Sequence, residues 1–291
     1  MDSRPLQENP QAHVRSEYRN LSHDFRGAVA LVTGSGRGLG RMIAETLLAG
    51  GASVALHDIN EEAPAQYGES TSLTALAEEF SRRGGKSIAV TGDITSESQI
   101  AAMVEKIETA LGPISILVNC AGGDIGAAGG KPNPNGALDI NLDDAMTVMN
   151  RNFWGTMLMC RAVVPGMAAR QRGTVINLGS LNGHVGVSPE TVYGCAKAAV
   201  IHYTRCLALE VRGAGVRVNA ISPGPTTTAR FLATRQTDQG KMPNEIEGVS
   251  LERYAKPSEI ADAVAFLASG QSGFISGQVL RVDGGLTLFA A

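Results

Sequence analysis

Residues 28–49 read AVALVTGSGRGLGRMIAETLLA and carry the pattern that decides the fold. The apolar run at 28–32 predicts a buried strand, and the residues from Arg41 onward predict a helix. Glycines fill the turn between them, so the backbone can approach a bound phosphate closely, and the helix N-terminus offers unpaired N–H groups. A strand, a glycine turn and a helix in this order predict a site for the pyrophosphate of a dinucleotide, with a plain tight turn as the alternative.

Strands and helices alternate along the rest of the chain. Further strands are predicted at 53–56, 87–90, 114–118, 174–178, 216–221 and 278–282. Helices are predicted at 61–83 with an interruption at 68–71, and at 97–111, 142–169, 194–212 and 258–268. We therefore expect an α/β fold, a single-domain doubly wound parallel sheet (Rossmann fold) with helices on both faces, over residues 27–291. Residues 1–26 are polar and without periodicity, which predicts a flexible N-terminal arm.

Composition excludes several classes of function. The 291 residues, 43% of them hydrophobic, suffice for one large domain with a full core. A net charge of −3 without a dense Lys/Arg run argues against a nucleic-acid partner, and no apolar run reaches the roughly 18 residues of a membrane span. The N-terminus has no signal-peptide core. The four cysteines, none in a CxxC pair, are interpreted as reduced packing residues of a cytoplasmic protein without a metal; they are Cys120, Cys160, Cys195 and Cys206.

A second stretch carries the candidate chemistry. Ser180 follows the predicted strand 174–178, and Tyr193 and Lys197 lie four residues apart at the start of a helix, on one helical face. A free phenol has a pKa of about 10, and an ammonium group one turn away favours its ionised form, which brings the pKa toward the working range of a general base. Most Tyr-x-x-x-Lys pairs are ordinary helix neighbours, so the pair gains weight only from the predicted dinucleotide site.

Side chains that follow the predicted strands are candidates for the dinucleotide cleft. Asp58 falls 24 positions after Gly34, near the spacing of a carboxylate that binds an adenosine ribose, and a turn or capping role is the alternative. Its neighbour His57 is interpreted as an exposed loop residue. Asp93 stands where a side chain can approach the adenine, although the residues after it could equally cap the next helix.

The segment after strand 114–118 is the least typical of the chain. Asn119 is expected to tie neighbouring strand ends together, and Ala121 and Gly122 to leave room for a flat ligand. The Gly/Pro/Asn-rich residues 124–136 predict a loop at the carboxyl end of a strand, where α/β folds place ligands. Substrate contact and subunit contact both remain open for this loop.

Two helical regions and one polar segment complete the pattern. Asn152 is a polar residue on the apolar face of helix 142–169, so it needs either a structural hydrogen bond or a bound water. The apolar surplus on helices 142–169 and 194–212 exceeds what one sheet face can bury, which predicts a homo-oligomer, a homotetramer with two-fold axes. Residues 229–250 are polar and without periodicity and are interpreted as a mobile lid.

These motifs together resemble the short-chain dehydrogenase/reductase family, a family of NAD(P)-dependent oxidoreductases, over about residues 27–287. The family's glycine motif matches Thr33, Gly34, Gly38 and Gly40, and its Asn-Ala-Gly motif matches Asn119, Ala121 and Gly122 with Cys120 as a variant. Its catalytic set falls on Asn152, Ser180, Tyr193 and Lys197, and its Pro-Gly on Pro223 and Gly224. Together, these motifs in this order and at the family's spacing are far more specific than any one of them. The chain departs from the family in a longer N-terminal arm, an enlarged 124–141 loop and the 226–254 segment.

The resemblance implies a role for each catalytic residue. Tyr193 would be the general acid/base, Lys197 would lower its pKa and bind the nicotinamide ribose, Ser180 would orient the substrate oxygen, and Asn152 would hold a water of a proton relay. Hydride would pass between the nicotinamide and a carbinol carbon. The residues expected around the cofactor are Gly34, Ser35, Arg37, Gly38, Leu39, Gly40, Asp58, Asp93, Ile94, Asn119, Ala121, Gly122, Tyr193, Lys197, Pro223, Gly224, Thr226 and Thr228.

The choice of cofactor and substrate stays partly open. Asp58 would repel a 2′-phosphate and favours NAD(H), whereas Arg37 could accept that phosphate and favours NADP(H); exclusion by a carboxylate outweighs attraction by a mobile arginine, so NAD is expected. The polar loops favour a small-molecule alcohol or ketone such as a sugar or sugar acid. The alternatives are a 3-oxoacyl thioester (acyl-carrier) reductase using NADP(H), a cyclic alcohol dehydrogenase, an epimerase or dehydratase, and a non-catalytic dinucleotide-binding sensor.

Overall fold

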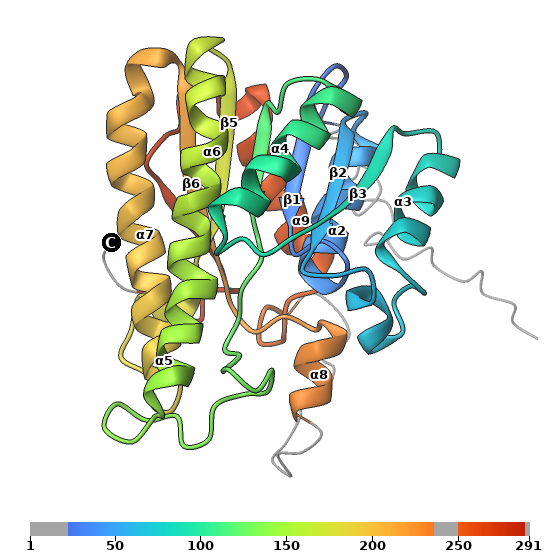
Figure 1. Cartoon of the computed structure of the whole chain (residues 1–291). Helices are drawn as coiled ribbons and strands as arrows, with labels where there is room; N and C mark the ends of the chain where they lie inside the picture. The colour runs from blue at the N-terminus through green and yellow to red at the C-terminus, as the bar shows by residue number, and fades with distance from the viewer. Residues whose placement is uncertain (1–22, 236–249, 289–291) are drawn as a thin grey trace, which may run out of the picture.

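The computed structural model describes residues 23–235 and 250–288, and they form one α/β domain (Figure 1). Its sheet has seven strands in the order β3-β2-β1-β4-β5-β6-β7, and every adjacent pair is parallel. The strands are β1 Val29–Thr33, β2 Ser53–Asp58, β3 Ser87–Thr91, β4 Ile116–Asn119, β5 Gly173–Leu178, β6 Val216–Pro223 and β7 Val279–Val282. This arrangement confirms the predicted doubly wound parallel sheet, and the seven predicted strands agree with it to within two residues at their starts and ends.

Helices cover both faces of the sheet (Figure 1). The helices are α2 Gly38–Ala49, α3 Leu73–Arg82, α4 Glu97–Leu111, α5 Leu142–Met149, α6 Gly155–Ala169, α7 Thr191–Val211, α8 Ala229–Arg235 and α9 Pro257–Ala268. One core layer joins the sheet to α2, α3 and α9, and the other joins it to α4, α6 and α7. Successive residues of β1 serve alternate layers: Ala30 and Val32 pack in the first, and Val29 and Leu31 in the second. A strand buried on both faces is therefore apolar throughout.

Two predicted helical regions are divided. The predicted helix 61–83 is a short 3₁₀ helix, Ala63–Tyr67, followed by α3, and Gly68 with φ of +69° separates them as expected. The side chain of Ser72 caps α3 by accepting a hydrogen bond from Ala75 N at 3.0 Å. The predicted helix 142–169 is α5 and α6 joined by a π-helical turn, Asn150–Trp154, which matters because it contains Asn152.

The predicted arm 1–26 and the predicted lid 229–250 each contain a part that is ordered in the structure. Residues 1–22 of the predicted arm lie outside the described residues, but Phe25 is only 4% exposed and packs in the core beside Gly50, whose carbonyl accepts a hydrogen bond from Phe25 N at 2.8 Å. The predicted lid 229–250 begins as α8, so this part is helical, while residues 236–249 lie outside the described part. Thr228 begins α8 by accepting a hydrogen bond from Phe231 N at 3.2 Å.

The cysteines do not share one environment. Cys160 is buried and Cys120 is half-buried, as packing cysteines should be, and burial raises the pKa of each thiol to about 12. Cys195 and Cys206, both on α7, are exposed in the single chain, so the packing interpretation is wrong for these two. Both lie on a helix for which the sequence predicts subunit contact.

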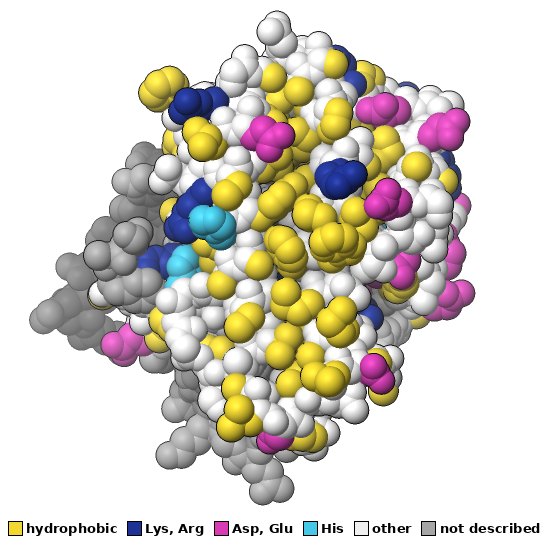
Figure 2. Space-filling model, turned by 60° about the vertical axis from the view of Figure 1, so that its left-hand side comes forward, with side chains coloured by type: hydrophobic (Ala, Val, Ile, Leu, Met, Phe, Trp, Pro, Cys, Tyr) yellow, Lys and Arg dark blue, Asp and Glu magenta, His cyan; other side chains and the backbone are white. Residues whose placement is uncertain are grey.

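Hydrophobic side chains gather on the face that carries α5, α6 and α7 (Figure 2). Leu142, Met146 and Leu209 are 79%, 60% and 62% exposed, and Trp154 is 46% exposed. Among the described residues, no helix is long and apolar enough to cross a membrane. The apolar surface over these helices is of the kind that marks contact with another protein chain.

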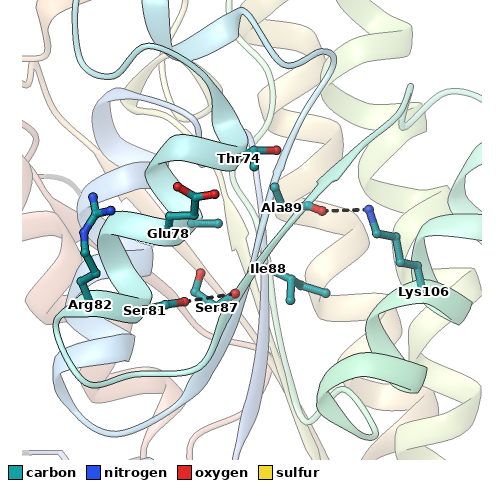
Figure 3. Close-up of a pocket in the computed structure, with 9 residues that line it drawn as sticks. Thr74, Glu78, Ser81, Arg82, Ser87, Ile88, Ala89 and Lys106 are labelled. Carbon is teal, nitrogen blue, oxygen red and sulfur yellow. Dashed lines mark hydrogen bonds between the residues drawn. The ribbon is translucent and has the colours of Figure 1, made fainter.

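A groove of about 550 Å³ lies at the opposite end of the sheet, against the edge strand β3 (Figure 3). It runs between α3 and α4, and Lys106 on α4 donates a hydrogen bond to Ala89 O at 3.0 Å. That bond satisfies one backbone carbonyl of the edge strand. The groove follows the side of β3, away from the ends of the central strands β4 and β5, where α/β folds place their ligands.

Candidate active site

The glycine turn between β1 and α2 has the close backbone approaches expected of a phosphate-binding turn. Gly34 has φ of +66°, and a Cβ at this position would lie 2.8 Å from Ala121 Cα, so only glycine fits. Helix α2 begins at Gly38, so Leu39 and Gly40 belong to its first turn, and Arg37 at its N-cap position makes no side-chain capping bond. These features fit a dinucleotide pyrophosphate, because the glycines of the turn place no Cβ of their own between the backbone and a phosphate.

His57 supports this turn from inside the protein and is not the exposed loop residue that the sequence suggested. It is 2% exposed, its Nδ1 accepts a hydrogen bond from Gly34 N at 3.3 Å, and its Nε2 pairs with Gly92 O at 3.0 Å. Burial lowers the pKa of His57, so the imidazole stays neutral. Ser35 is also fully buried, and its hydroxyl accepts a hydrogen bond from His57 N at 2.9 Å, so its side chain faces the interior.

Asp58 lies where a ribose-binding carboxylate is expected, at the carboxyl end of β2. It is 7% exposed, and its Oδ1 accepts a hydrogen bond from Ile59 N at 2.9 Å. A Cβ placed on Gly36 would lie 2.8 Å from Asp58 Oδ2, so the carboxylate sits against the glycine turn. The ribose-binding role of Asp58 stays a prediction.

Arg37 faces the 3₁₀ segment Ala63–Tyr67. Its guanidinium lies 5.2 Å from the centroid of the Tyr67 ring and donates hydrogen bonds to Ala63 O at 3.3 Å and to Gln66 Oε1. A cation held over an aromatic ring and by two acceptors loses part of its freedom to follow a ligand. The segment between β2 and α3 therefore positions this arginine.

Glu69 was not anticipated from the sequence. Both of its carboxylate oxygens lie 2.8 Å from Gly38 N, the first backbone N–H of α2, and its backbone carbonyl accepts a hydrogen bond from Arg41. A carboxylate at this place is stabilised by the unpaired N–H group and by the helix dipole. A pocket of about 310 Å³ adjoins it, lined in part by Thr227 and Thr228. The same end of the helix that suits a pyrophosphate thus holds an acidic side chain of the protein.

Asp93 and Ile94 follow β3. Asp93 Oδ1 accepts hydrogen bonds from the backbone N and the hydroxyl of Thr95, both at 2.8 Å, which closes the turn before α4. Ile94 is 6% exposed and packs on Gly155, where a Cβ would lie 2.5 Å from Ile94 Cδ1. The Ser96 side chain at the N-cap of α4 makes no capping bond, and the Thr95 hydroxyl donates to Asp93, so the expected side-chain cap is not formed. The contact of Asp93 with the adenine stays a prediction.

The end of β4 is tied to its neighbours as predicted. Asn119 Nδ2 donates to Asn177 Oδ1 on β5 at 2.9 Å, which links the two strand ends. Thr33 on β1 accepts hydrogen bonds from Cys120 N and Ala121 N, each at 3.0 Å, and this fixes the start of the loop that contains Gly122. The loop is therefore rigid where a flat ligand would lie against it.

Asn152 holds the same loop from the other side. It is fully buried in the π-helical turn, donates to Gly123 O at 2.9 Å and to Val148 O at 2.8 Å, and accepts from Gly123 N at 2.9 Å. Of the two alternatives for this residue, the structure shows the structural hydrogen bonds. Its role in a proton relay stays a prediction.

Tyr193, Lys197 and Ser180 come together at the carboxyl end of β5. Lys197 is 5% exposed, its Nζ donates to Leu178 O at 2.7 Å, and the same Nζ lies 5.7 Å from the centroid of the Tyr193 ring. Burial lowers the pKa of Lys197 to about 8. Ser180 Oγ accepts a hydrogen bond from Asn182 N at 3.2 Å. The three side chains form the arrangement that a Tyr-Lys-Ser proton-transfer site requires.

The acidity of Tyr193 differs from the sequence expectation. The pKa of Tyr193 is raised to about 12, mainly by burial and to a smaller extent by the negative charges of Glu190 and Asp124, while the hydrogen bond with Ser180 and the charge of Arg230 act to lower it. The expected fall in pKa is therefore not a property of the protein alone. Taking the phenol out of water outweighs the hydrogen bond with Ser180 and the charge of Arg230.

The loop after β6 connects β7 to the glycine turn. Gly224 N donates to Val282 O at 3.0 Å, which anchors the Pro223–Gly224 pair to β7, and Thr226 Oγ1 donates to Gly224 O at 2.9 Å. A Cβ at Gly38 would lie 3.6 Å from Thr228, so this loop reaches the glycine turn. Residues far apart in the sequence are thus brought together at the carboxyl ends of the parallel strands, where the glycine turn and the loop after β6 meet.

Comparisons with known proteins agree with this geometry. A family model described as "Enoyl-(Acyl carrier protein) reductase" matches residues 34–287. The chain is 33% identical over 270 residues to 2-(S)-hydroxypropyl-CoM dehydrogenase 3 of Xanthobacter autotrophicus, covering 92% of this chain and 99% of that protein. It is 34% identical over 265 residues to the 3-oxoacyl-[acyl-carrier-protein] reductase FabG of Vibrio harveyi, covering 90% of this chain and 98% of that protein.

Two solved structures are similar over nearly the whole chain. A 3-oxoacyl-[acyl-carrier protein] reductase with bound NAD from Brucella melitensis superposes with a TM-score of 0.75 at 27% identity, covering 99% of both chains. A 7α-hydroxysteroid dehydrogenase complexed with NADH and 7-oxo glycochenodeoxycholic acid superposes with a TM-score of 0.76 at 29% identity, covering 90% of this chain and 95% of that one. Each of these two relatives is described with a nicotinamide cofactor.

Proposed function

We propose, on the premise that this chain belongs to the short-chain dehydrogenase/reductase family, that it transfers a hydride between NAD(H) and a hydroxylated small molecule. Membership makes the chain a nicotinamide-dependent oxidoreductase of alcohol or ketone groups. The finer proposal is that the substrate is a secondary alcohol or ketone such as a sugar or sugar acid. The observation that carries the proposed hydride transfer is that Tyr193, Lys197 and Ser180 lie together at the carboxyl ends of the strands.

The cofactor supplies the hydride chemistry, and the residues of this chain supply position and proton transfer. Tyr193 holds the proton that moves to or from the substrate oxygen, and Ser180 orients that oxygen by a hydrogen bond. Lys197 places a positive charge beside the ring of Tyr193 and stabilises the phenolate. Asn152 keeps the loop at Gly123 in place, so that the wall of the cleft does not yield when the substrate binds.

Two buried acceptors beside this cleft support a hydroxylated substrate. Asp124 Oδ1 and Asn135 Oδ1 make no hydrogen bond within the part of the chain that the structure describes. The other carboxylate oxygen of Asp124 accepts from Asn135 Nδ2 at 2.7 Å, so the two side chains form one polar unit. Asp124 also contributes to the electrostatic environment of Tyr193. Free acceptors at such a place suit donor hydroxyl groups of a substrate, because an unpaired buried acceptor is costly.

The proposal of NAD(H) rests on Asp58 and Arg37. Asp58 lies against the glycine turn, where its charge would oppose a 2′-phosphate. Arg37 is engaged by Tyr67, Gln66 and Ala63, which draws it toward the 3₁₀ segment. Both observations favour NAD(H) over NADP(H).

We also propose a homotetramer. Leu142, Met146, Trp154 and Leu209 give α5, α6 and α7 an apolar surface that one chain leaves exposed (Figure 2). Burial of such a surface stabilises a subunit interface by about 25 cal/mol per Å² of apolar area. Light scattering at micromolar concentration tests the proposal, and a monomeric mass would contradict it.

The activity is tested by incubating the purified protein with NAD⁺ and a panel of polyols, sugar acids and simple secondary alcohols while the absorbance of reduced nicotinamide is followed. A 3-oxoacyl thioester reductase using NADP(H) is the second candidate, supported by the likeness to reductases of that name and by the presence of Arg37. The same assay run in reverse, with NADPH and acetoacetyl thioester, separates the two. Absence of turnover with both cofactors would favour the sensor alternative.

A further inference from the structure

Arg230 lies against the loop that follows β4, on a helix that the sequence did not predict. It is the second residue of α8, and its Nη1 lies 3.4 Å from Gly122 O, to which it donates a hydrogen bond. Gly122 belongs to the loop at the carboxyl end of β4. This contact brings a cation of α8 to the wall against which the reacting groups are expected to lie.

The contact depends on a glycine. Gly123 has φ of +124°, and a Cβ at this position would lie 2.7 Å from both terminal nitrogens of Arg230. The guanidinium therefore lies directly against the Gly122–Gly123 backbone, which Asn152 holds from the opposite side. A rigid backbone on one side gives the guanidinium a defined position.

The charge of Arg230 reaches the catalytic tyrosine. It lowers the pKa of Tyr193, and it also lowers the pKa of Asp124, although burial raises the latter overall. Burial lowers the pKa of Arg230 itself, yet a guanidinium remains ionised at neutral pH. The site thus holds a partly desolvated cation within electrostatic range of the atom that exchanges a proton with the substrate.

Among the described residues, the charged groups that act on Arg230 include two further cations. Arg37 and Arg151 both lower the pKa of Arg230, so the positive charge around it is in excess of what one guanidinium supplies. Of the nearby acids, Asp124 accepts from Asn135, while Glu190 accepts from Lys131 Nζ at 2.6 Å and from Asn182 Nδ2 at 2.7 Å. A partly desolvated guanidinium binds a planar anion strongly because it can donate two parallel hydrogen bonds.

We propose that Arg230 is a specificity-determining residue that pairs with a carboxylate on the substrate, so that the chain acts on hydroxy acids and the corresponding oxo acids. The inference rests on the proposed dehydrogenase function and narrows it. The carboxylate would contact Arg230 at the Gly123 wall, and the substrate's hydroxyl groups would face Asp124 and Asn135. The competing role for Arg230 is contact with the pyrophosphate of the cofactor, which the experiment distinguishes.

The experiment compares matched pairs of substrates with NAD⁺. A panel of short hydroxycarboxylates and sugar acids is assayed beside the methyl ester of each, for the wild type and for Arg230→Gln and Arg230→Lys. Arg172→Gln is the control, because Arg172 is exposed and directly precedes β5 at the amino end of the strand. Binding of NADH is measured by fluorescence for every variant, and binding of succinate to each NADH complex is measured by the change in that fluorescence.

The wild type and Arg172→Gln should prefer the acid over its ester by about tenfold or more in kcat/KM, as expected for one charge-assisted pair. Arg230→Gln should lose this preference through a higher KM for the acids and should no longer bind succinate, with the Kd of NADH unchanged, while Arg230→Lys keeps part of both. Equal rates for acid and ester in the wild type would overturn the inference alone. Weaker NADH binding in Arg230→Gln with the preference intact would overturn it in favour of the pyrophosphate, and absence of turnover with succinate still bound through Arg230 would contradict only the proposed function.

Discussion

The ammonium nitrogen of Lys197 lies 5.7 Å from the centroid of the Tyr193 ring while it donates a hydrogen bond to Leu178 O at 2.7 Å. One helical turn of α7 fixes this separation, and the carbonyl at the end of β5 fixes the direction of the lysine. The pair is therefore positioned by secondary structure.

Tyr193→Phe removes only the transferable proton. Turnover should fall by about 10²–10⁴, the usual contribution of a general acid/base, while the Kd of NADH stays nearly constant. Tyr203→Phe on the same helix serves as the control and should retain activity, since Tyr203 lies nearly three helical turns after Tyr193 and packs edge-on against Phe153. If Tyr193→Phe kept a tenth of wild-type turnover, the assigned role would be wrong.

Lys197→Met should stabilise the protein at neutral pH while abolishing turnover. The pKa of Lys197 is about 8 in the folded protein against an ordinary 10.5, because burial disfavours the ammonium. The unfolded chain therefore binds this proton more tightly, and the charged lysine costs at most about 3 kcal/mol of the free energy of unfolding below pH 8. Loss of the bond to Leu178 O offsets about 1 kcal/mol of the gain.

The sign of this effect is checked by pH. Wild-type stability should rise relative to that of Lys197→Met as pH increases from about 8 to 10.5, since the lysine becomes neutral in the unfolded chain as well. Thermal unfolding at pH 7 and pH 10 measures it. A variant that is less stable by the same amount at both values would show that the lysine is not strained by burial.

Asp58→Ala should shift the choice of cofactor. The wild type should prefer NAD⁺ in kcat/KM, and the alanine variant should gain about tenfold or more with NADP⁺, because a carboxylate no longer opposes the 2′-phosphate. Steady-state kinetics with both cofactors measure the change. A wild type that prefers NADP⁺ would instead show that Arg37 leaves Tyr67 and governs the pocket.

Glu69→Gln should tighten NADH binding several-fold. The carboxylate of Glu69 accepts a hydrogen bond from Gly38 N. A pyrophosphate that binds this N–H group must displace the carboxylate, and it meets a like charge nearby. Fluorescence titration gives the Kd. Glu79→Gln is the matched control. Glu79 on α3 lies 3.7 Å from Arg41, which is on α2 like Gly38, but Glu79 does not contact Gly38. Weaker binding in Glu69→Gln alone would make this carboxylate a structural cap that the cofactor needs.

The sequence predicted what local pattern determines. The strands and the glycine turn follow from apolar runs and from spacing, and the tie between Asn119 and Asn177 follows from adjacent strand ends. His57 was misread because β2 is buried on both faces, so no alternation distinguishes its interior residues from a loop. Glu69 and Arg230 were missed because their partners lie 31 and 108 positions away, and neither belongs to a motif.

The raised pKa of Tyr193 also could not be predicted from the sequence. The spacing of Tyr193 and Lys197 reports a cation one turn away, but it does not report how much water the fold removes from the phenol. Desolvation depends on the assembled walls of the cleft, which come from several elements. The exposure of Cys195 and Cys206 could not be predicted from the sequence either, since an Ala-rich helix has no clear polar side that would mark its solvent-facing residues.

The 124–136 loop is joined to the start of the catalytic helix. Lys131 and Asn182 both donate to the carboxylate of Glu190, and Glu190 N donates to Asn135 O at 3.0 Å, although Glu190 itself has the unfavourable φ of +81°. Glu190 in turn raises the pKa of Tyr193. The loop therefore cannot be exchanged without an effect on the catalytic helix. A different loop sequence would change the pKa of Tyr193 as well as the substrate selectivity. During divergence of such enzymes, a change of substrate here would shift the pH range of catalysis in the same step.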